Sequence, residues 1–156
     1  MLQAVSSPAE RIQQARTRAG LDPATVAQTI GLPEGWYFDL EHFNSEVTGN
    51  ISLDQFLRLA ELVGLTPLGI LEGPDYPEPN RRISLAQLVD LARQQMQSAG
   101  LSVDAYSDRV GWEMAPVFAD PAYLRSYTVD ALQGLCREVG VDWHKALPEK
   151  LRPGAG

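Results

Sequence analysis

The sequence predicts an all-α protein made of two similar halves in tandem. Motifs of the first half recur in the second: Ala19-Gly20-Leu21 and Ile30-Gly31 reappear 80 positions later as Ala99-Gly100-Leu101 and Val110-Gly111. A second set of matches falls at an offset of 76: Ser52, Leu53, Phe56, Leu59, Ala60, Val63, Gly64 and Leu71 against Thr128, Val129, Leu132, Leu135, Cys136, Val139, Gly140 and Leu147. The apolar residues recur at helical spacings of three and four, and no segment alternates as a strand does. A duplicated helical domain, four residues shorter in the middle of its second copy, explains these observations.

The first half is expected to hold five helices. They cover residues 8–19, 23–30, 33–41, 53–63 and 67–71. Ser7 to Glu10 and Ser52 to Gln55 each have the spacing of a capping box, and glycines such as Gly31 supply the left-handed residue that ends a helix. The polar residues 42–50 predict a loop, and Trp36, Tyr37 and Leu40 are available for the inner face of the third helix.

The second half repeats this order with a compressed third helix. Capping residues precede its first, second and fourth helices at Ser84, Ser102 and Thr128. The third helix is expected over 112–120, where Pro116 is tolerable only in the first turn and Pro121 ends the helix. A final turn follows Asp142. The predicted domains are 1–72 and 83–150, joined by a proline-rich linker, 73–82, and followed by a tail, 151–156.

Composition and charge narrow the function classes. The chain is 44% hydrophobic and 21% charged, typical of a globular protein, and no apolar run or leader pattern indicates a membrane or export; a cytoplasmic protein is expected. A single cysteine excludes an internal disulfide, and Cys136 is expected in the core. Residues 1–80 contain 4 basic and 11 acidic side chains and residues 81–156 contain 9 of each, so the first half should not attract polyanions.

No pattern of residues indicates catalysis, a metal or a cofactor. A metal site needs three or four converging ligands, and the two histidines, His42 and His144, lie in different halves. The carboxylates come without a nucleophile or a glycine-framed motif. We therefore expect no enzyme activity, no metal, no cofactor and no small-molecule substrate.

The helix pattern resembles a known family of regulators. Five short helices, with one glycine between helices one and two and another between two and three, are similar to the Cro/CI-type helix-turn-helix domain, a lambda-repressor-like fold of phage and bacterial regulators. The resemblance covers residues 8–71 and, more loosely, 84–147. Ile30-Gly31-Leu32 fits the family's tight turn, and Leu40-Glu41 fits the end of its third helix. The resemblance implies two tandem domains whose third helices would lie in the DNA major groove.

The positions that read DNA in the family differ in this chain. The serine-glutamine pair that begins helix two is replaced by Asp22-Pro23 in the first half and Ser102-Val103 in the second. The positions of the third helices that would face DNA hold Glu34, Phe38 and Asp39, and then Glu113, Met114, Ala119 and Asp120. Carboxylates offer nothing to the hydrogen-bond acceptors of guanine or adenine. Between Arg18 and Arg58 no basic residue is present to contact phosphate.

A protein-binding role is the leading hypothesis. Trp36, Tyr37 and Phe38 are consecutive, so one helix stripe cannot bury all three, and exposed aromatics are typical of protein interfaces. The expected partner or recognition face comprises Glu34, Trp36, Tyr37, Phe38, Asp39, Phe43, Glu113, Met114 and Phe118. We expect a regulatory protein that acts through a protein partner or through self-association, with no membrane contact.

Two alternatives stay open from the sequence. The first is a sequence-specific DNA-binding transcriptional regulator, of repressor or antitoxin type, that uses mainly the second half, with Arg109 and Arg125 contacting phosphate. The second is a scaffold whose duplicated domains form a symmetric dimer.

Overall fold

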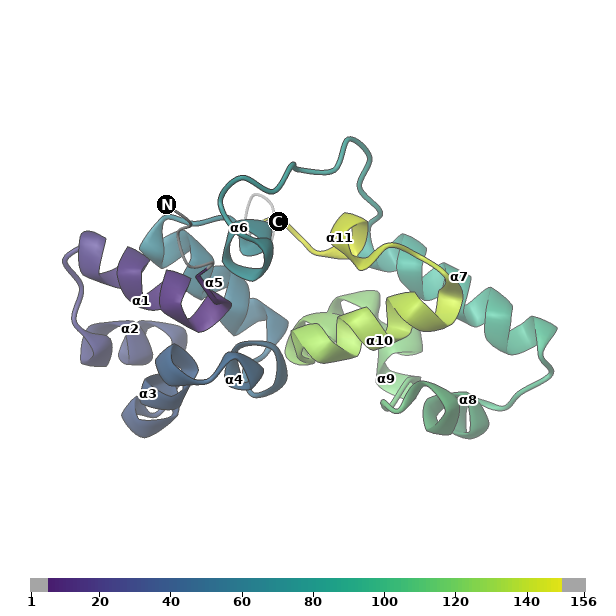
Figure 1. Cartoon of the computed structure of the whole chain (residues 1–156). Helices are drawn as coiled ribbons and strands as arrows, with labels where there is room; N and C mark the ends of the chain where they lie inside the picture. Colours follow the sequence, from purple (N-terminus) through teal and green to yellow (C-terminus); the bar gives the residue numbers. More distant parts are fainter. Residues whose placement is uncertain (1–5, 150–156) are drawn as a thin grey trace. The chain divides into compact units, whose positions relative to one another are not determined.

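The computed structural model describes residues 6–149, and all of the regular structure in that range is helical (Figure 1). It contains eleven α-helices and one 3-10 helix and no strand, which confirms the all-α prediction for this part of the chain. The described residues divide into two compact units, 6–78 with 148–149 (unit 1) and 79–147 (unit 2). The domain limits given above stay predictions, and the tail 151–156 lies outside the described residues.

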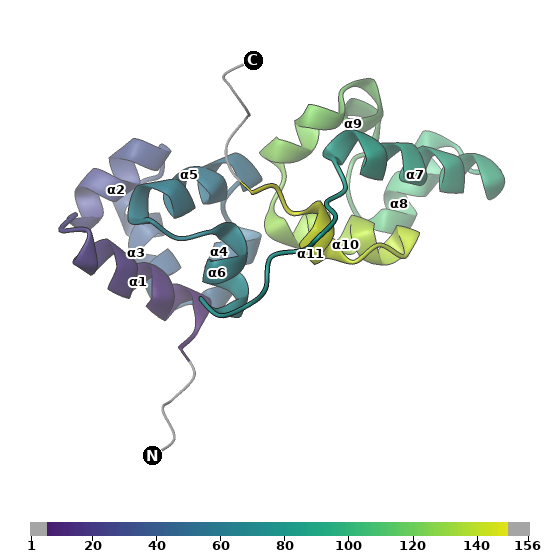
Figure 2. The ribbon, with the colours of Figure 1, turned by 90° about the horizontal axis from the view of Figure 1, so that it is seen from above.

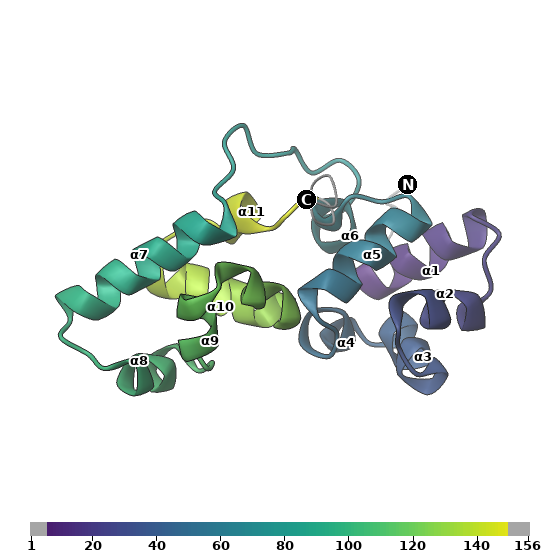
Figure 3. The same cartoon turned by 180° about the vertical axis from the view of Figure 1, so that it is seen from behind.

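Unit 1 contains six helices where five were expected. They are α1 (Pro8–Arg18), α2 (Pro23–Ile30), α3 (Glu34–His42), α4 (Asn44–Gly49), α5 (Leu53–Val63) and α6 (Pro67–Glu72). The α5 helix lies at the centre, and α1, α2 and α6 pack against it (Figure 3). It buries Leu53, Phe56, Leu57, Leu59, Ala60 and Val63. The spacing of these residues at three and four is that of a single apolar stripe.

The predicted loop over 42–50 is wrong, because α4 occupies most of it. Val47 is fully buried and anchors the short helix, and the Asn44 side chain accepts a hydrogen bond of 2.9 Å from the Ala9 backbone N–H. Phe43 is extended and separates α3 from α4. One buried valine in six residues is too little periodicity to predict a helix.

Unit 2 also contains six helices. They are α7 (Leu85–Ser98), α8 (Val103–Val110), α9 (Ala115–Ala119), the 3-10 helix η1 (Pro121–Ser126), α10 (Val129–Val139) and α11 (Trp143–Ala146). In this unit α10 packs against α7, α8 and α11 (Figure 2). The expected helix over 112–120 shortens to α9, because Gly111 is left-handed, Pro116 lies in the first turn and Asp120 is extended. The η1 helix was not expected; the Asp120 side chain accepts from the Ala122 N–H at its start.

The two units repeat the same order of elements. The α2 and α8 helices begin and end 80 positions apart, and α5 and α10 do so 76 positions apart. The offset falls by four residues between these two pairs of helices, mostly because the third helix shortens from 9 residues in α3 to 5 in α9. The six glycines of the repeat all have positive φ: Gly20, Gly31, Gly64, Gly100, Gly111 and Gly140. The repeat therefore keeps its turns and shortens one helix.

The expected caps hold with one exception. Ser52 with Gln55 and Ser84 with Gln87 form complete capping boxes. Ser7 accepts from the Glu10 N–H, but its hydroxyl, and not its backbone N–H, donates to the Glu10 carboxylate, so only half of that box forms. Cys136 is buried, as predicted. None of the described helices is long and apolar enough to cross a bilayer.

Candidate functional site

The third helix of unit 1 has a buried side and a solvent side. Tyr37, Leu40 and Glu41 face inward at helical spacing. The opposite side carries Gly35 and His42, both exposed, and Asp39, which is half-buried; Glu34 is exposed in the first turn. This orientation fixes which of the expected residues can meet a partner.

A buried ion pair joins α3 to α1. Glu41 is 5% exposed and Arg16 is 13% exposed; Arg16 Nε lies 2.5 Å from Glu41 Oε2, and Arg16 Nη2 lies 3.1 Å from Oε1. Arg16 Nη1 also donates to the Leu21 carbonyl over 2.9 Å. Burial, reinforced by Glu41, raises the pKa of the Tyr37 phenol well above its ordinary value. The pair is bidentate and holds the solvent side of α3 in a fixed orientation.

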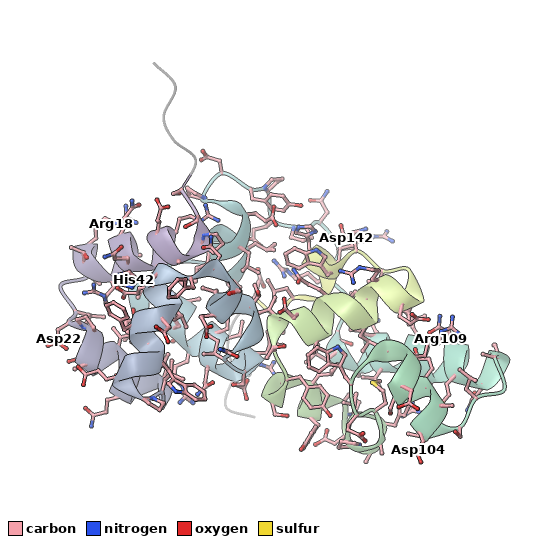
Figure 4. The ribbon with its side chains drawn as sticks, turned by 60° about the horizontal axis from the view of Figure 1, so that its bottom comes forward. Arg18, Asp22, His42, Asp104, Arg109 and Asp142 are labelled. Atoms are coloured by element: carbon pink, nitrogen blue, oxygen red, sulfur yellow. The ribbon has the colours of Figure 1, made fainter. Side chains whose placement is uncertain are left out.

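Three aromatic side chains of this region are exposed to solvent. Trp36 is 57% exposed, Phe38 59% and Phe43 55%. His42, labelled at the end of α3 in Figure 4, stacks on Phe38 with ring centroids 4.0 Å apart, and its Nδ1 lies 2.7 Å from the Phe38 carbonyl oxygen. Phe38 and His42 share one flank of α3, and Trp36 lies on another, because residues two positions apart in a helix do not face each other. We call Trp36, Phe38, His42 and Phe43 the aromatic face.

Two residues of the expected partner face are not accessible. Tyr37 in α3 and Met114 before α9 are fully buried, because each lies on the inward stripe of its segment. The Met114 N–H donates to Ser107 Oγ over 2.9 Å, which holds the turn against α8. Trp36, a candidate both for the inner face and for the partner face, is exposed. The partner face therefore loses Tyr37 and Met114.

In unit 2 the corresponding residues are partly covered. Glu113 is exposed, whereas Phe118 is half-buried. The Arg93 guanidinium lies over the Phe118 ring, 5.2 Å from its centroid, and Arg93 Nη2 donates to the Phe118 carbonyl over 2.9 Å. Tyr106 lies on the same ring at a centroid distance of 6.1 Å. Phe118 thus contributes more to the packing of unit 2 than to its surface.

Three basic side chains of unit 2, Arg82, Arg93 and Arg109, have acidic or carbonyl partners. Arg109, labelled on α8 in Figure 4, places Nε 2.6 Å from Glu138 Oε1. Arg93 pairs with Asp90 over 2.9 Å, and Arg82 donates to the Leu147 carbonyl over 2.9 Å. Arg125 lies half-buried in η1. A phosphate would have to compete with the Glu138 carboxylate for Arg109 and would be repelled by it.

Sequence reasoning missed an open groove on unit 2. Its volume is about 820 Å³, and its lining includes Trp112, Tyr123 and Tyr127 together with Asp108 and Glu113. We call it the aromatic groove. Aromatics at 112, 123 and 127 are visible in the sequence, but only the fold of α9 and η1 brings them together.

The histidines and acidic residues do not form a metal centre in the part of the chain that the structure describes. His144 Nδ1 lies 2.6 Å from Asp142 Oδ1, and the His144 ring stacks on Trp143 with centroids 3.8 Å apart. Hydrogen bonding to His144 lowers the pKa of Asp142. Asp142 caps the last turn, so this contact has a structural role.

Comparison of the chain with known protein families, with characterised proteins and with solved structures gives no significant match. The class that the structure itself defines is an all-α protein with an internal repeat of six helices.

Proposed function

We propose that this chain is a regulatory protein on a Cro/CI-type helix-turn-helix scaffold that acts through protein contacts at its third helices. The observation that carries the proposal is the exposure of three large aromatic side chains on and directly after α3, each more than half exposed. Interfaces are enriched in such aromatics, whereas a duplex groove repels carboxylates.

The arrangement of α2 and α3 supports the scaffold assignment. Gly31 joins these helices in a left-handed turn, and the Gln55 side chain donates to the carbonyls of Ile30 and Gly31 over 3.2 and 3.3 Å. The equivalent helices of unit 2 are joined at Gly111, which is also left-handed. Two helices joined by a tight turn, with the second at the surface, are the arrangement that the resemblance implies.

The charges of unit 1 argue against reading DNA with this scaffold. Arg16 is committed to Glu41, and Arg11 donates to the carbonyls of Ile70 and Leu71 over 2.7 and 3.0 Å. A DNA-binding regulator that uses Arg109 and Arg125 is the alternative, and the pairing of Arg109 with Glu138 weighs against it.

The test compares proteins retained by the full chain and by a Trp36→Ser/Phe38→Ser variant on an affinity matrix. Both residues are exposed, so the variant should fold; Leu91→Ser, an exposed apolar change on α7, is the matched control. A partner should be retained by wild type and control and lost by the double variant. Equal retention by all three would contradict the proposal.

Self-association through the aromatic face has its own measurement. Sedimentation velocity over a range of concentrations gives the mass of wild type and of the double variant. If the partner is a second copy, the wild type forms a dimer that the variant does not. A strictly monomeric wild type removes the symmetric-dimer alternative.

A further inference from the structure

The aromatic groove of unit 2 has the size and walls of a ligand site. Its volume of about 820 Å³ lies within the range of small-molecule pockets and leaves ample room for an arginine side chain. The ring centroids of Trp112 and Tyr127 are 6.3 Å apart, and those of Tyr123 and Tyr127 are 5.6 Å apart at an interplanar angle of 89°. The three rings therefore form one aromatic cluster that lines the groove.

The rings are held in place by their neighbours. The Tyr127 hydroxyl donates to the Glu113 carbonyl over 2.5 Å, which ties η1 to the turn before α9. Trp112 packs close to α10, because a Cβ built on Gly134 would lie 3.4 Å from Trp112 Nε1. Tyr123 is 46% exposed and lines the groove. Fixed rings lose little conformational freedom when a ligand binds.

The charge of the groove is negative. Asp108 and Glu113 line it, both are exposed, and none of the described lining residues is basic. Glu113 lies next to the rings, because its backbone carbonyl accepts from the Tyr127 hydroxyl and the residue lines the groove. Aromatic faces and carboxylates together attract a cation and disfavour an anion.

We propose that the aromatic groove binds an arginine side chain presented by a basic segment of a partner protein. The planar guanidinium can lie on the ring of Trp112 or Tyr127 and hydrogen-bond to the carboxylate of Asp108 or Glu113 at the same time, which an ammonium does less well. Unit 2 uses the same chemistry internally, since the Arg93 guanidinium lies over Phe118 and donates to a carbonyl. The inference rests on the proposed function, because it takes the partner to be a protein.

The test is an NMR titration of the full ¹⁵N-labelled chain with a glycine-arginine-glycine-arginine-glycine peptide. We expect saturable shifts of the amides that border the groove, including Gly111, Ser126 and Thr128. A peptide with citrulline in place of arginine keeps the shape without the charge and should bind at least about fivefold more weakly, the effect of one exposed cation–π contact. The corresponding lysine peptide should also bind more weakly than the arginine peptide.

Variants separate the groove from the general acidity of the chain. Glu113→Gln should weaken binding by about two- to fivefold, and Tyr123→Ala should weaken it similarly because the Tyr123 ring lines the groove and packs edge-on against Tyr127. The control is Asp104→Asn, an exposed carboxylate at the start of α8 outside the groove, which should change the affinity by less than about twofold. Unchanged amide spectra away from the substitution show that each variant is folded.

Several results would overturn the inference. They are the absence of saturable shifts, shifts spread over both units, equal binding of the citrulline or lysine peptide, and a loss for Asp104→Asn as large as that for Glu113→Gln. None of them affects the test of the aromatic face, whose residues lie in unit 1. Failure of the arginine site and failure of the proposed function are therefore distinguishable.

Discussion

Breaking the Arg16–Glu41 pair is expected to destabilise unit 1 strongly. Removing one member of a buried pair leaves an uncompensated charge, at a cost of about 3–5 kcal/mol. The loss of stability for Glu41→Leu should lie near the lower end of this range, because Arg16 keeps its hydrogen bond to the Leu21 carbonyl and some exposure to water. Arg16→Met should cost more, because it leaves the Glu41 carboxylate with only 5% exposure.

The double variant Arg16→Met/Glu41→Leu should recover most of this loss. The equivalent positions of unit 2 are Met96, at the offset of 80, and Phe118, one residue before the end of α9 as Glu41 is one residue before the end of α3. Unit 2 therefore has two apolar side chains at the positions that hold the ion pair in unit 1. Because apolar replacements of buried pairs are often neutral, we expect the double variant within about 1 kcal/mol of wild type.

The assay is urea unfolding of the full chain followed by methyl NMR resonances. Ile12 and Val26 are buried in unit 1 and report its midpoint, while Val89 and Val117 report on unit 2, whose midpoint should not move. The double-mutant cycle then gives the coupling energy. The stabilising role of the pair would be refuted if the losses of unfolding free energy of the two single variants simply add in the double variant. It would also be refuted if each single loss is below about 0.5 kcal/mol.

Three further predictions concern local features. Gly31→Ala should lower the stability of unit 1 by about 1 kcal/mol, because the φ of Gly31 is +72°. Gly35→Ala should raise that stability by about 1 kcal/mol, because Gly35 lies inside α3 and a Cβ there would have no atom within 4 Å. Equal effects of the two substitutions in urea unfolding would contradict the assigned turn. Burial raises the pKa of Cys136 to about 12, so the thiol stays protonated at pH 8. Cys136 should therefore react with thiol reagents only when urea unfolds the chain. Rapid labelling of the folded protein would contradict the buried position of the thiol. Ser84→Ala removes a complete capping box and should lower the stability of unit 2 by about 1 kcal/mol with no change in unit 1; a loss shared by both units would argue against a local effect.

Local signals in the sequence were sufficient for most helices. The α2, α5, α8 and α10 helices begin after a capping side chain and end at a left-handed glycine, so their limits depend on short-range chemistry. The α4 helix has no such signal; it forms because Val47 enters the core and Asn44 accepts from Ala9. Its stability comes from contacts distant in sequence, which periodicity does not report.

The site was less predictable than the fold. Three consecutive aromatics guarantee that one is exposed, but the choice depends on how α3 is rotated, and the Arg16–Glu41 pair, whose residues are 25 positions apart, constrains that rotation. Tyr37 therefore turns inward, and Trp36 and Phe38 turn outward. The aromatic groove depends on the shortened α9 and on η1, neither of which the sequence predicted with its observed limits.

Fluorescence anisotropy of a labelled mixed-sequence DNA duplex, titrated with the full chain at low and at physiological salt, tests the central claim most directly. The proposed protein-binding role predicts no saturation at micromolar protein and little dependence on salt, because α3 contains carboxylates and no lysine or arginine, and Arg109 is paired with Glu138. Tight binding whose affinity falls by about a thousandfold or more between 50 and 200 mM salt would contradict it and favour the DNA-binding alternative.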